Sequence, residues 1–372
     1  MSKLINQGGF GCIFYPGFNC KGEYTEKQKN SVTKLQINDF AGENEIYIGS
    51  LIKELPNYSL YFLPVISSCS IGLASLNPKY IDKCKIISKN DPEYLLLELP
   101  YLKNISFKEL FSDKFRTNKH LFMTFIETYS YITGTIGQLL DINVVHYDLK
   151  EQNILYSTKY ENPILIDFGI SIPIDKIEND TLSDYFYVYA PDYSLWSPEI
   201  HAINYLVNVG EILTREIIEK LMTDYVSHNI ALSVFSEGFR ERYKLAGIQW
   251  LSKYENKNKY DVIKELLKFY KTWDLYSLSI MYLRFFKILF IDGFIDNKLI
   301  SGFSQLLLVN ISPNPNNRLD IQDTLRRYRE VFFINEKPEN YFALIENLNY
   351  TNFSAHFPFW VDWNTLIDYY KR

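Results

Sequence analysis

The sequence predicts an α+β protein in which a small β-rich part precedes a larger helical part, with the boundary near residues 100–104. Short apolar runs bounded by turn residues are typical of strands and fill most of the first hundred residues. Beyond residue 102, apolar residues recur at the spacing of amphipathic helices. Apolar residues make up 47% of the chain and charged residues 22%, which is ordinary for a folded globular protein.

Each element follows from the same two patterns. In the first part we expect strands at 4–15, 31–36, 62–70 and 94–99, a polar loop at 16–30, and one helix at 43–55 that ends before Pro56. In the second part we expect helices at 105–112, 118–140, 211–225, 273–289 and 322–333, with a strand-and-loop stretch at 143–172.

Charge and hydropathy exclude two classes of partner. The chain has 39 Lys and Arg against 44 Asp and Glu, a formal net charge of −5, which argues against a nucleic-acid-binding protein. The N-terminus lacks the apolar core of a signal peptide. The most apolar stretch, 278–294, is interrupted by three charged residues and is too short and too charged to span a bilayer. We therefore expect a cytoplasmic protein with no nucleic-acid or membrane partner.

Four cysteines stand at positions 12, 20, 69 and 84. They form no CxxC pair, and four in 372 residues is too few for the disulfide framework of a small secreted protein. The sequence therefore predicts unpaired cysteines and a reducing compartment.

Two neighbouring motifs carry oxygen and amine groups suited to phosphate chemistry. The stretch HYDLKEQN places Asp148, Lys150 and Asn153 in one loop, and the apolar run ILIDFG ends in Asp167. Carboxylate and amide oxygens on adjacent loops suit a hard cation such as Mg²⁺ bridging to phosphates. The order and spacing of these four residues predict that they face one pocket.

These motifs resemble the HRDLKxxN catalytic loop and the DFG motif of eukaryotic protein kinases of the Ser/Thr type. The resemblance implies that Asp148 accepts the proton of the substrate hydroxyl and that Lys150 contacts the γ-phosphate of ATP. It implies that Asn153 and Asp167 hold Mg²⁺, or Mn²⁺ in its place.

The resemblance covers nearly the whole chain and implies a bilobal protein kinase-like fold. The small β-rich N-lobe would span 1–103, and the larger helical C-lobe would span 104–372. Glu199 in SPE, Arg318 and Asp274 resemble later family motifs. Asp274 lies 75 positions after Glu199, which exceeds the family's usual spacing, so we expect a helical insert at about 203–262.

Upstream, INQGGFGCI at 5–13 resembles the glycine-rich nucleotide loop, with Asn6 in place of the first family glycine. Glycine lets backbone amides approach phosphates without a side-chain clash. The residues that the resemblance assigns to nucleotide binding here are Gly8, Gly9, Phe10, Gly11 and, against the adenine, Ile13 and Val32.

Val32-Thr33-Lys34 resembles the family strand that carries the phosphate-binding lysine. Glu45 on the following helix is the chosen partner of Lys34, and Glu43 remains the alternative. The segment 92–100 resembles the strand that enters the hinge between lobes, which would place Glu98 and Pro100 beside the adenine.

The chain departs from the family at Tyr147, where the family has the Arg of HRD. That Arg receives an activation-segment phosphate, and Tyr offers no cationic fork. We therefore expect activity without phosphorylation of the segment 170–199. The insertion at 16–30 and the GGFG motif look similar to kinases of large DNA viruses, for which host cytoplasm or the virion would be the location.

The leading hypothesis is a protein serine/threonine kinase that uses ATP and Mg²⁺ on protein substrates. The alternative is a catalytically weak, nucleotide-binding pseudokinase scaffold, which Asn6 and the short Lys34–Glu45 spacing favour. A third reading is a small-molecule phosphotransferase on the same fold, against which Lys150 and the SPE segment argue. Oligomeric state is left open by the sequence.

Overall fold

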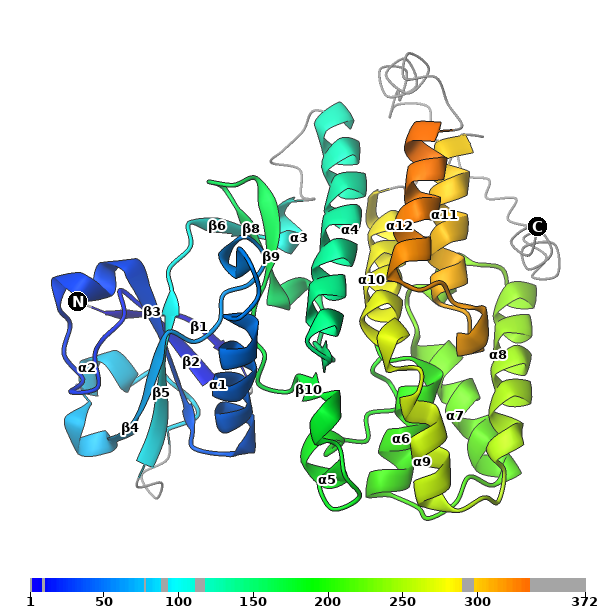
Figure 1. Cartoon of the computed structure of the whole chain (residues 1–372), viewed down its shortest axis with the longest axis horizontal. Coiled ribbons are helices and arrows are strands. Elements are labelled where there is room, and N and C mark those ends of the chain that lie inside the picture. The colour runs from blue at the N-terminus through cyan, green and yellow to red at the C-terminus, as the bar shows by residue number, and fades with distance from the viewer. Residues whose placement is uncertain are drawn as a thin grey trace. The chain divides into compact units, whose positions relative to one another are not determined.

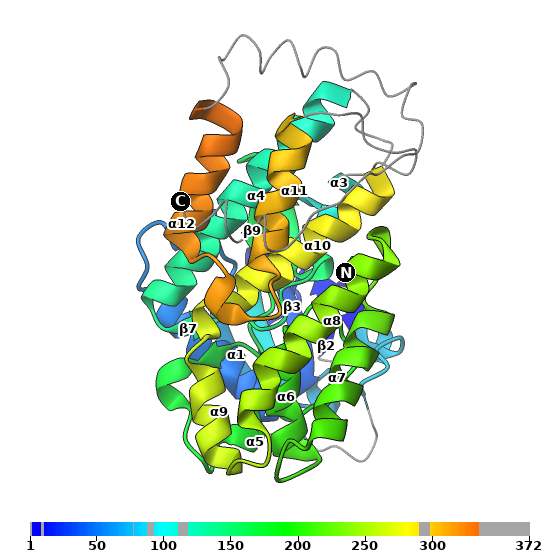
Figure 2. The same ribbon diagram turned by 90° about the vertical axis from the view of Figure 1, so that its right-hand side faces the viewer.

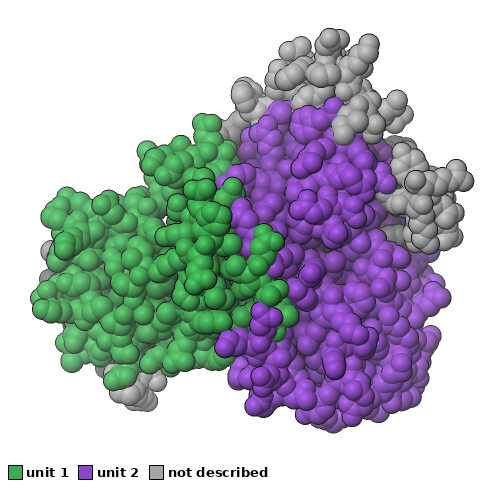
Figure 3. Space-filling view, in the orientation of Figure 1, with its two compact units in different colours: residues 1–107, 141–148, 152–174 green, residues 108–140, 149–151, 175–372 purple. Residues whose placement is uncertain are grey.

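The computed structural model describes residues 2–8, 11–76, 78–87, 93–110, 118–289 and 298–334. The chain divides into two compact units, coloured separately in Figure 3. Unit 1 comprises residues 1–107, 141–148 and 152–174, and unit 2 comprises 108–140, 149–151 and 175–372. The mixed α+β class is confirmed, with a sheet in unit 1 and helices dominating unit 2.

Unit 1 is built on a five-stranded antiparallel sheet in the order β1-β2-β3-β5-β4 (Figure 1). Its strands are β1 (Lys3–Gly8), β2 (Gly11–Tyr15), β3 (Ser31–Ile37), β4 (Ser67–Gly72) and β5 (Glu93–Pro100). Strand β5, which lies between β3 and β4, reads EYLLLELP, a nearly continuous apolar run, because both faces of this strand are covered.

Each face of the sheet has its own apolar cluster. Helix α1 (Phe40–Ile52) begins at Asp39, whose carboxylate accepts the Gly42 amide at 3.1 Å. Ile46 of this helix packs with Leu95, Leu97 and Leu99 of β5 on one face. On the other face Phe14, Leu35 and Tyr94 pack with residues of the 69–87 segment. The sheet therefore presents a helix-covered face and a separate face covered by loop residues.

The remaining strands of unit 1 form two small sheets, and most of these strands come from residues 141–174. Strands β6, β8 and β9 form a three-stranded sheet, and β7 pairs with β10. Their bounds, with those of helix α2, are β6 (Asn104–Ser106), β7 (Val144–Val145), β8 (Ile154–Ser157), β9 (Asn162–Leu165), β10 (Ile172–Pro173) and α2 (Pro78–Ile81).

Unit 2 is helical, and α11 packs against both α10 and α12 (Figure 2). Short helices are α3 (Phe107–Leu110), which begins in unit 1, and α5 (Leu182–Tyr185). The longer helices are α4 (Asn118–Asp141), α6 (Pro198–Asn208), α7 (Arg215–His228), α8 (Glu237–Leu251), α9 (Lys259–Leu267), α10 (Trp273–Leu289), α11 (Lys298–Asn310) and α12 (Ile321–Arg329), the last followed by a π-helical turn at 330–334.

A buried ion pair lies at the centre of unit 2. The Arg318 guanidinium contacts the Glu199 carboxylate through two nitrogens, with Nη2 to Oε2 at 2.9 Å. Its Nε donates to the Ser312 carbonyl at 2.8 Å, and its Cζ lies 4.7 Å from the Tyr276 ring centroid. Both charged side chains are fully buried, so their mutual contact and hydrogen bonds offset the cost of desolvation.

Several predicted elements differ from the structure in their bounds. The strand expected at 62–70 begins only at Ser67, because residues up to 66 form turns and a single bridge from Phe62 to Leu165. The helix expected at 43–55 starts earlier, at its Asp39 cap, and ends at Ile52 before Pro56. The helices expected at 118–140 and 273–289 are confirmed almost residue for residue.

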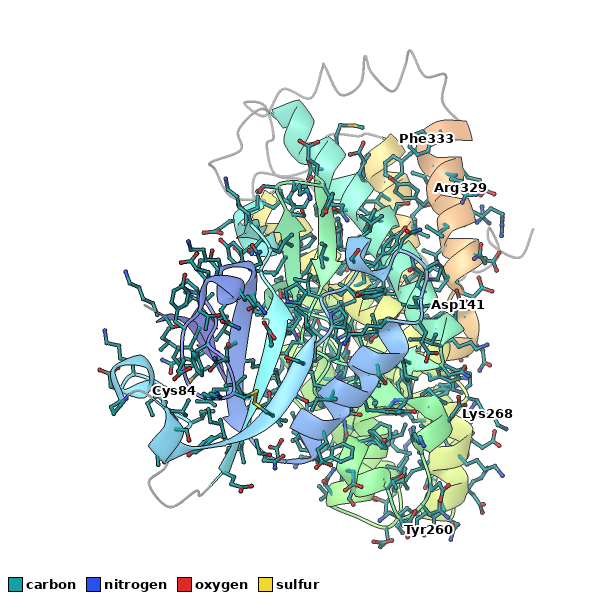
Figure 4. The ribbon with its side chains drawn as sticks, turned by 60° about the vertical axis from the view of Figure 1, so that its left-hand side comes forward. Cys84, Asp141, Tyr260, Lys268, Arg329 and Phe333 are labelled. Carbon is teal, nitrogen blue, oxygen red and sulfur yellow. A yellow bond between two sulfur atoms is a disulfide. The ribbon has the colours of Figure 1, made fainter. Side chains whose placement is uncertain are left out.

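The expectation of unpaired cysteines is wrong. All four cysteines form disulfides, Cys12 with Cys84 and Cys20 with Cys69 (the sulfur–sulfur bond beside Cys84 is drawn in Figure 4). The partners are 72 and 49 residues apart, so no local sequence motif predicts the pairing. They meet because the 16–30 loop and the 69–87 segment fold over the same face of the sheet. The basis for predicting a reducing compartment is thereby removed.

The expected domain boundary and insert stay predictions. Unit 1 also includes residues 141–148 and 152–174, which the sequence analysis assigned to the second lobe. Helix α6 runs through position 203, where the insert was expected to begin. Side chains of α7 and α8 contribute to the core of unit 2, since Tyr225 and Tyr243 both hydrogen-bond the buried Tyr276 hydroxyl.

Among the helices of the described residues, none combines the length and the apolar character needed to cross a membrane.

The disulfides should differ in their resistance to reduction. Cys20 is exposed, whereas Cys12 is fully buried, so graded dithiothreitol under native conditions should reduce Cys20–Cys69 first. Alkylation followed by mass spectrometry measures the order.

The Cys12→Ser/Cys84→Ser variant should lose about 4 kcal/mol of stability, because the disulfide no longer closes a loop of 72 residues in the unfolded chain. Alkylation of all four cysteines without reductant would contradict the pairing.

The buried ion pair should be sensitive to removal of one partner. Glu199→Gln leaves the Arg318 guanidinium buried beside a neutral amide, and the free energy of unfolding should fall by about 3–5 kcal/mol. Denaturant unfolding followed by tryptophan fluorescence measures this, because Trp196, Trp250 and Trp273 are buried in the described part of unit 2. Glu219→Gln, at the exposed pair with Arg215, is the control and should cost less than about 1 kcal/mol. Equal losses in the two variants would refute the assignment.

Candidate active site

Lys34 joins three segments of unit 1 at one atom. It lies on β3, and its Nζ contacts Oε2 of Glu45 on α1 at 2.6 Å and Oδ1 of Asp167 at 2.7 Å. Lys34 and Asp167 are 133 residues apart in the chain. The partner of Lys34 on the helix is therefore Glu45, as chosen from the sequence, while Glu43 lies on the exposed side of α1.

The buried charges of this cluster shift one another's pKa values. Burial opposes the charged form of the Lys34 ammonium, but the Glu45 and Asp167 carboxylates outweigh it and raise the pKa of Lys34. Burial raises the pKa of Glu45, which Lys34 opposes and the charge of Asp167 reinforces. Two carboxylates thus contact one ammonium.

A second group of polar side chains lies in the 146–153 loop. Asn153 donates its amide nitrogen to Oδ2 and to the backbone carbonyl of Asp148, both at 2.9 Å. The Asp148 amide donates to the His146 carbonyl at 2.8 Å. Asp148 and Asn153 are both buried, and these bonds fix the orientation of the Asp148 carboxylate.

The backbone connects this loop to Asp167. The Ile166 amide donates to the Asn153 carbonyl at 3.0 Å, and Nε2 of His146 donates to the Ile166 carbonyl at 3.1 Å. Asp167 follows Ile166 directly, so the structure brings Lys34, Glu45, Asp148, Asn153 and Asp167 into one connected set within unit 1.

One residue of this set, Asp167, and Tyr147, which directly precedes Asp148, have left-handed backbone conformations. Tyr147 has φ +68° and Asp167 has φ +67°. Such conformations are costly for residues other than glycine and concentrate at functional sites. Tyr147 is buried, and it carries the strain directly before Asp148.

Ile13 and Val32 lie on the same face of the sheet as Lys34. Ile13 pairs directly opposite Lys34, and Val32 lies two residues before Lys34 on β3. Gly11 is needed at the adjoining end of β2, because a Cβ there would lie 2.9 Å from the Leu35 carbonyl oxygen. The strand pairing thus brings these four predicted residues together.

The other predicted nucleotide contacts are placed less completely. Gly8 ends β1 and pairs with Gly11, while Gly9 and Phe10 lie outside the described residues. Glu98 accepts the Ser67 hydroxyl at 2.8 Å. Pro100 ends β5 opposite Ser31.

Lys150 is not assigned to unit 1, to which the connected set of residues belongs. It is assigned to unit 2 with its neighbours Leu149 and Glu151, and its side chain is half-buried. Glu151 forms an ion pair with Arg284 of α10 at 3.6 Å. The role of Lys150 at the γ-phosphate stays a prediction.

The residues predicted to hold a metal are two oxygen-bearing side chains. Within the described residues, no three His, Cys, Asp or Glu side chains are grouped as a metal site. The donor set here is the Asp167 carboxylate, which is 29% exposed, together with the side-chain oxygen of Asn153, whose nitrogen is engaged by Asp148. Such a set suits Mg²⁺, which takes one or two protein ligands and completes its shell with water and phosphate.

Comparison with the models of known protein families gave no match, and comparison with curated proteins gave none either.

One residue of the site was missed in the sequence. Asn44 is buried on α1 beside Glu45, and its amide nitrogen donates to the carbonyls of Gly169 at 3.0 Å and Ser171 at 2.8 Å. It falls four residues before Ile48, on the buried face of the helix. The signal was an amide side chain in phase with the apolar residues Ile48 and Ile52 of the helix.

Proposed function

We propose that the chain is an ATP- and Mg²⁺-dependent protein serine/threonine kinase. The observation that carries the proposal is the double contact of Lys34 with Glu45 and Asp167. A lysine held between a helix carboxylate and a partly exposed Asp is a fixed positive charge suited to the phosphates of a nucleotide. The resemblance of the sequence motifs to protein kinases assigns the same residues to that task.

The arrangement supports a role for each neighbour of Lys34. Asp148, oriented by the Asn153 amide, would accept the proton of a substrate hydroxyl. Asp167 and Asn153 would hold Mg²⁺, which neutralises charge on the β- and γ-phosphates when bound. Ile13 and Val32, on the Lys34 face, would pack against the adenine. Lys150 would contact the transferred phosphoryl group.

Substitution of the proposed base should separate chemistry from binding. Asp148→Asn should lower phosphoryl transfer from labelled ATP to protein hydroxyls by about 100-fold or more, because a general base contributes that much. Affinity for a non-hydrolysable ATP analogue should persist. The assay contains purified protein and Mg²⁺ or Mn²⁺. Generic protein substrates and the chain itself are offered as phosphate acceptors. Asp261→Asn, at an exposed position on α9, is the matched control.

The outcomes distinguish the alternatives. Label on Ser or Thr that is lost only in Asp148→Asn supports the kinase. A wild-type chain that binds Mg²⁺–nucleotide but transfers no phosphate to any protein or small hydroxylated compound supports the scaffold. Transfer to small compounds alone supports the third reading, and absence of nucleotide binding refutes all three.

Activity should not depend on phosphorylation of the segment 170–199. Tyr147 provides no cationic fork for a phosphate. The end of the segment is held by unmodified groups of unit 2: the Leu195 carbonyl accepts the Ser277 hydroxyl at 2.7 Å, and the Ser194 carbonyl accepts the Tyr225 hydroxyl at 3.1 Å. Phosphatase-treated protein, checked by mass spectrometry, should keep the activity of untreated protein. Loss of activity on dephosphorylation would sink this prediction.

A further inference from the structure

We propose that Asn44 is a positioning residue that sets the orientation of Asp167 toward nucleotide-bound Mg²⁺. This inference rests on the proposed function, in which Asp167 serves that metal. Asn44 touches neither the carboxylate nor Lys34 in its hydrogen bonds; it acts through the backbone that follows Asp167.

The contact uses the whole donor capacity of one nitrogen. Nδ2 of Asn44 carries two hydrogens and donates to two carbonyls, those of Gly169 and Ser171. The side chain is 5% exposed, so water does not readily replace these bonds. Aspartate has the same shape but carries no donor at neutral pH, and an aliphatic side chain has none.

The turn after Asp167 lies directly against α1. A Cβ on Gly169 would lie 3.4 Å from the Ala41 carbonyl oxygen and 3.6 Å from Oε2 of Glu45. The turn is closed by the Ser171 amide, which donates to the Phe168 carbonyl at 3.1 Å. The three helical neighbours of the turn named here, Ala41, Asn44 and Glu45, have the spacing i, i+3, i+4 and therefore lie on one face of α1.

Asn44 and Glu45 hold the same segment at two points. Glu45 reaches Asp167 through Lys34, by charge, while Asn44 holds the backbone two to four residues later, by neutral hydrogen bonds. The left-handed backbone at Asp167 needs such support, because it is disfavoured for Asp in isolation. A shift of α1 would loosen both points together, which couples the helix to the metal-binding carboxylate.

The first measurement is binding rather than activity. Calorimetry with a non-hydrolysable ATP analogue gives the affinity with and without Mg²⁺. In Asn44→Ala the gain in affinity that Mg²⁺ confers should fall by about 10- to 30-fold, the equivalent of two net hydrogen bonds of about 1 kcal/mol each. Affinity without Mg²⁺ should change little, because Lys34 and Glu45 remain.

The second measurement needs no ligand. Hydrogen exchange at the amides of 168–171, including the Ser171 amide bonded to Phe168, should speed up in Asn44→Ala. Asn162→Ala is the matched control: it removes another buried amide of unit 1, one that donates to the Leu60 carbonyl at 2.6 Å. That control should lower stability without changing exchange at 168–171 or the effect of Mg²⁺.

Hydrogen exchange and Mg²⁺-dependent binding together distinguish a failure of the Asn44 inference from a failure of the proposed function. Unchanged exchange at 168–171, or a Mg²⁺ effect lost equally in both variants, overturns the role of Asn44 and leaves the kinase proposal standing. A wild-type chain that binds no nucleotide overturns the proposed function and the metal part of this inference with it. If Asn44→Ala does not fold, Asn44→Ser keeps one donor and should show the same two effects at about half the free energy.

Discussion

The geometry of unit 1 depends on a single buried cation, the ammonium of Lys34. It must reach a helix carboxylate and Asp167 at once, so β3, α1 and the turn after β9 are fixed relative to one another. An uncompensated charge in this position would be costly, because Lys34 and Glu45 are almost fully buried. The register of β3 on β2 and β5 follows from the same demand, since a slip of one residue would turn Lys34 to the other face.

The two faces of the sheet differ in what they carry. The face opposite Lys34 carries Phe14, Leu35 and Tyr94 with both ends of the Cys12–Cys84 disulfide. Apolar burial and a covalent link stabilise the strands there, whereas the Lys34 face combines its own apolar cluster with polar groups that cost desolvation. Cys12 directly follows Gly11, so the covalent link is anchored one residue from the close approach of Gly11 to the Lys34 side chain.

Short motifs predicted several residues that the structure brings together, and tertiary contacts supplied the rest. The grouping of Asp148, Asn153 and Asp167 could be predicted because these residues lie close together in the sequence and have side chains of the types that phosphate and metal sites use. The choice between Glu45 and Glu43 depends on which residues of α1 face inward, and this in turn depends on where the helix begins after its Asp39 cap. The cysteine pairing and the bonds of Asn44 join residues 49 to 127 positions apart, and composition and local pattern contain no information on such distances.

Buried ion pairs contribute little net stability when compared with well-packed apolar residues, so their presence calls for another reason. In unit 2 the Glu199–Arg318 pair joins the start of α6 to the chain before α12, and it fixes one arrangement of two distant segments. In unit 1, Asp167 adds a second, partly exposed carboxylate to the ammonium of Lys34. This second carboxylate is the feature that separates the Lys34 cluster from the Arg318 pair. A partly exposed carboxylate beside a buried ion pair is what the proposed function requires, because that function assigns Asp167 to a metal ion.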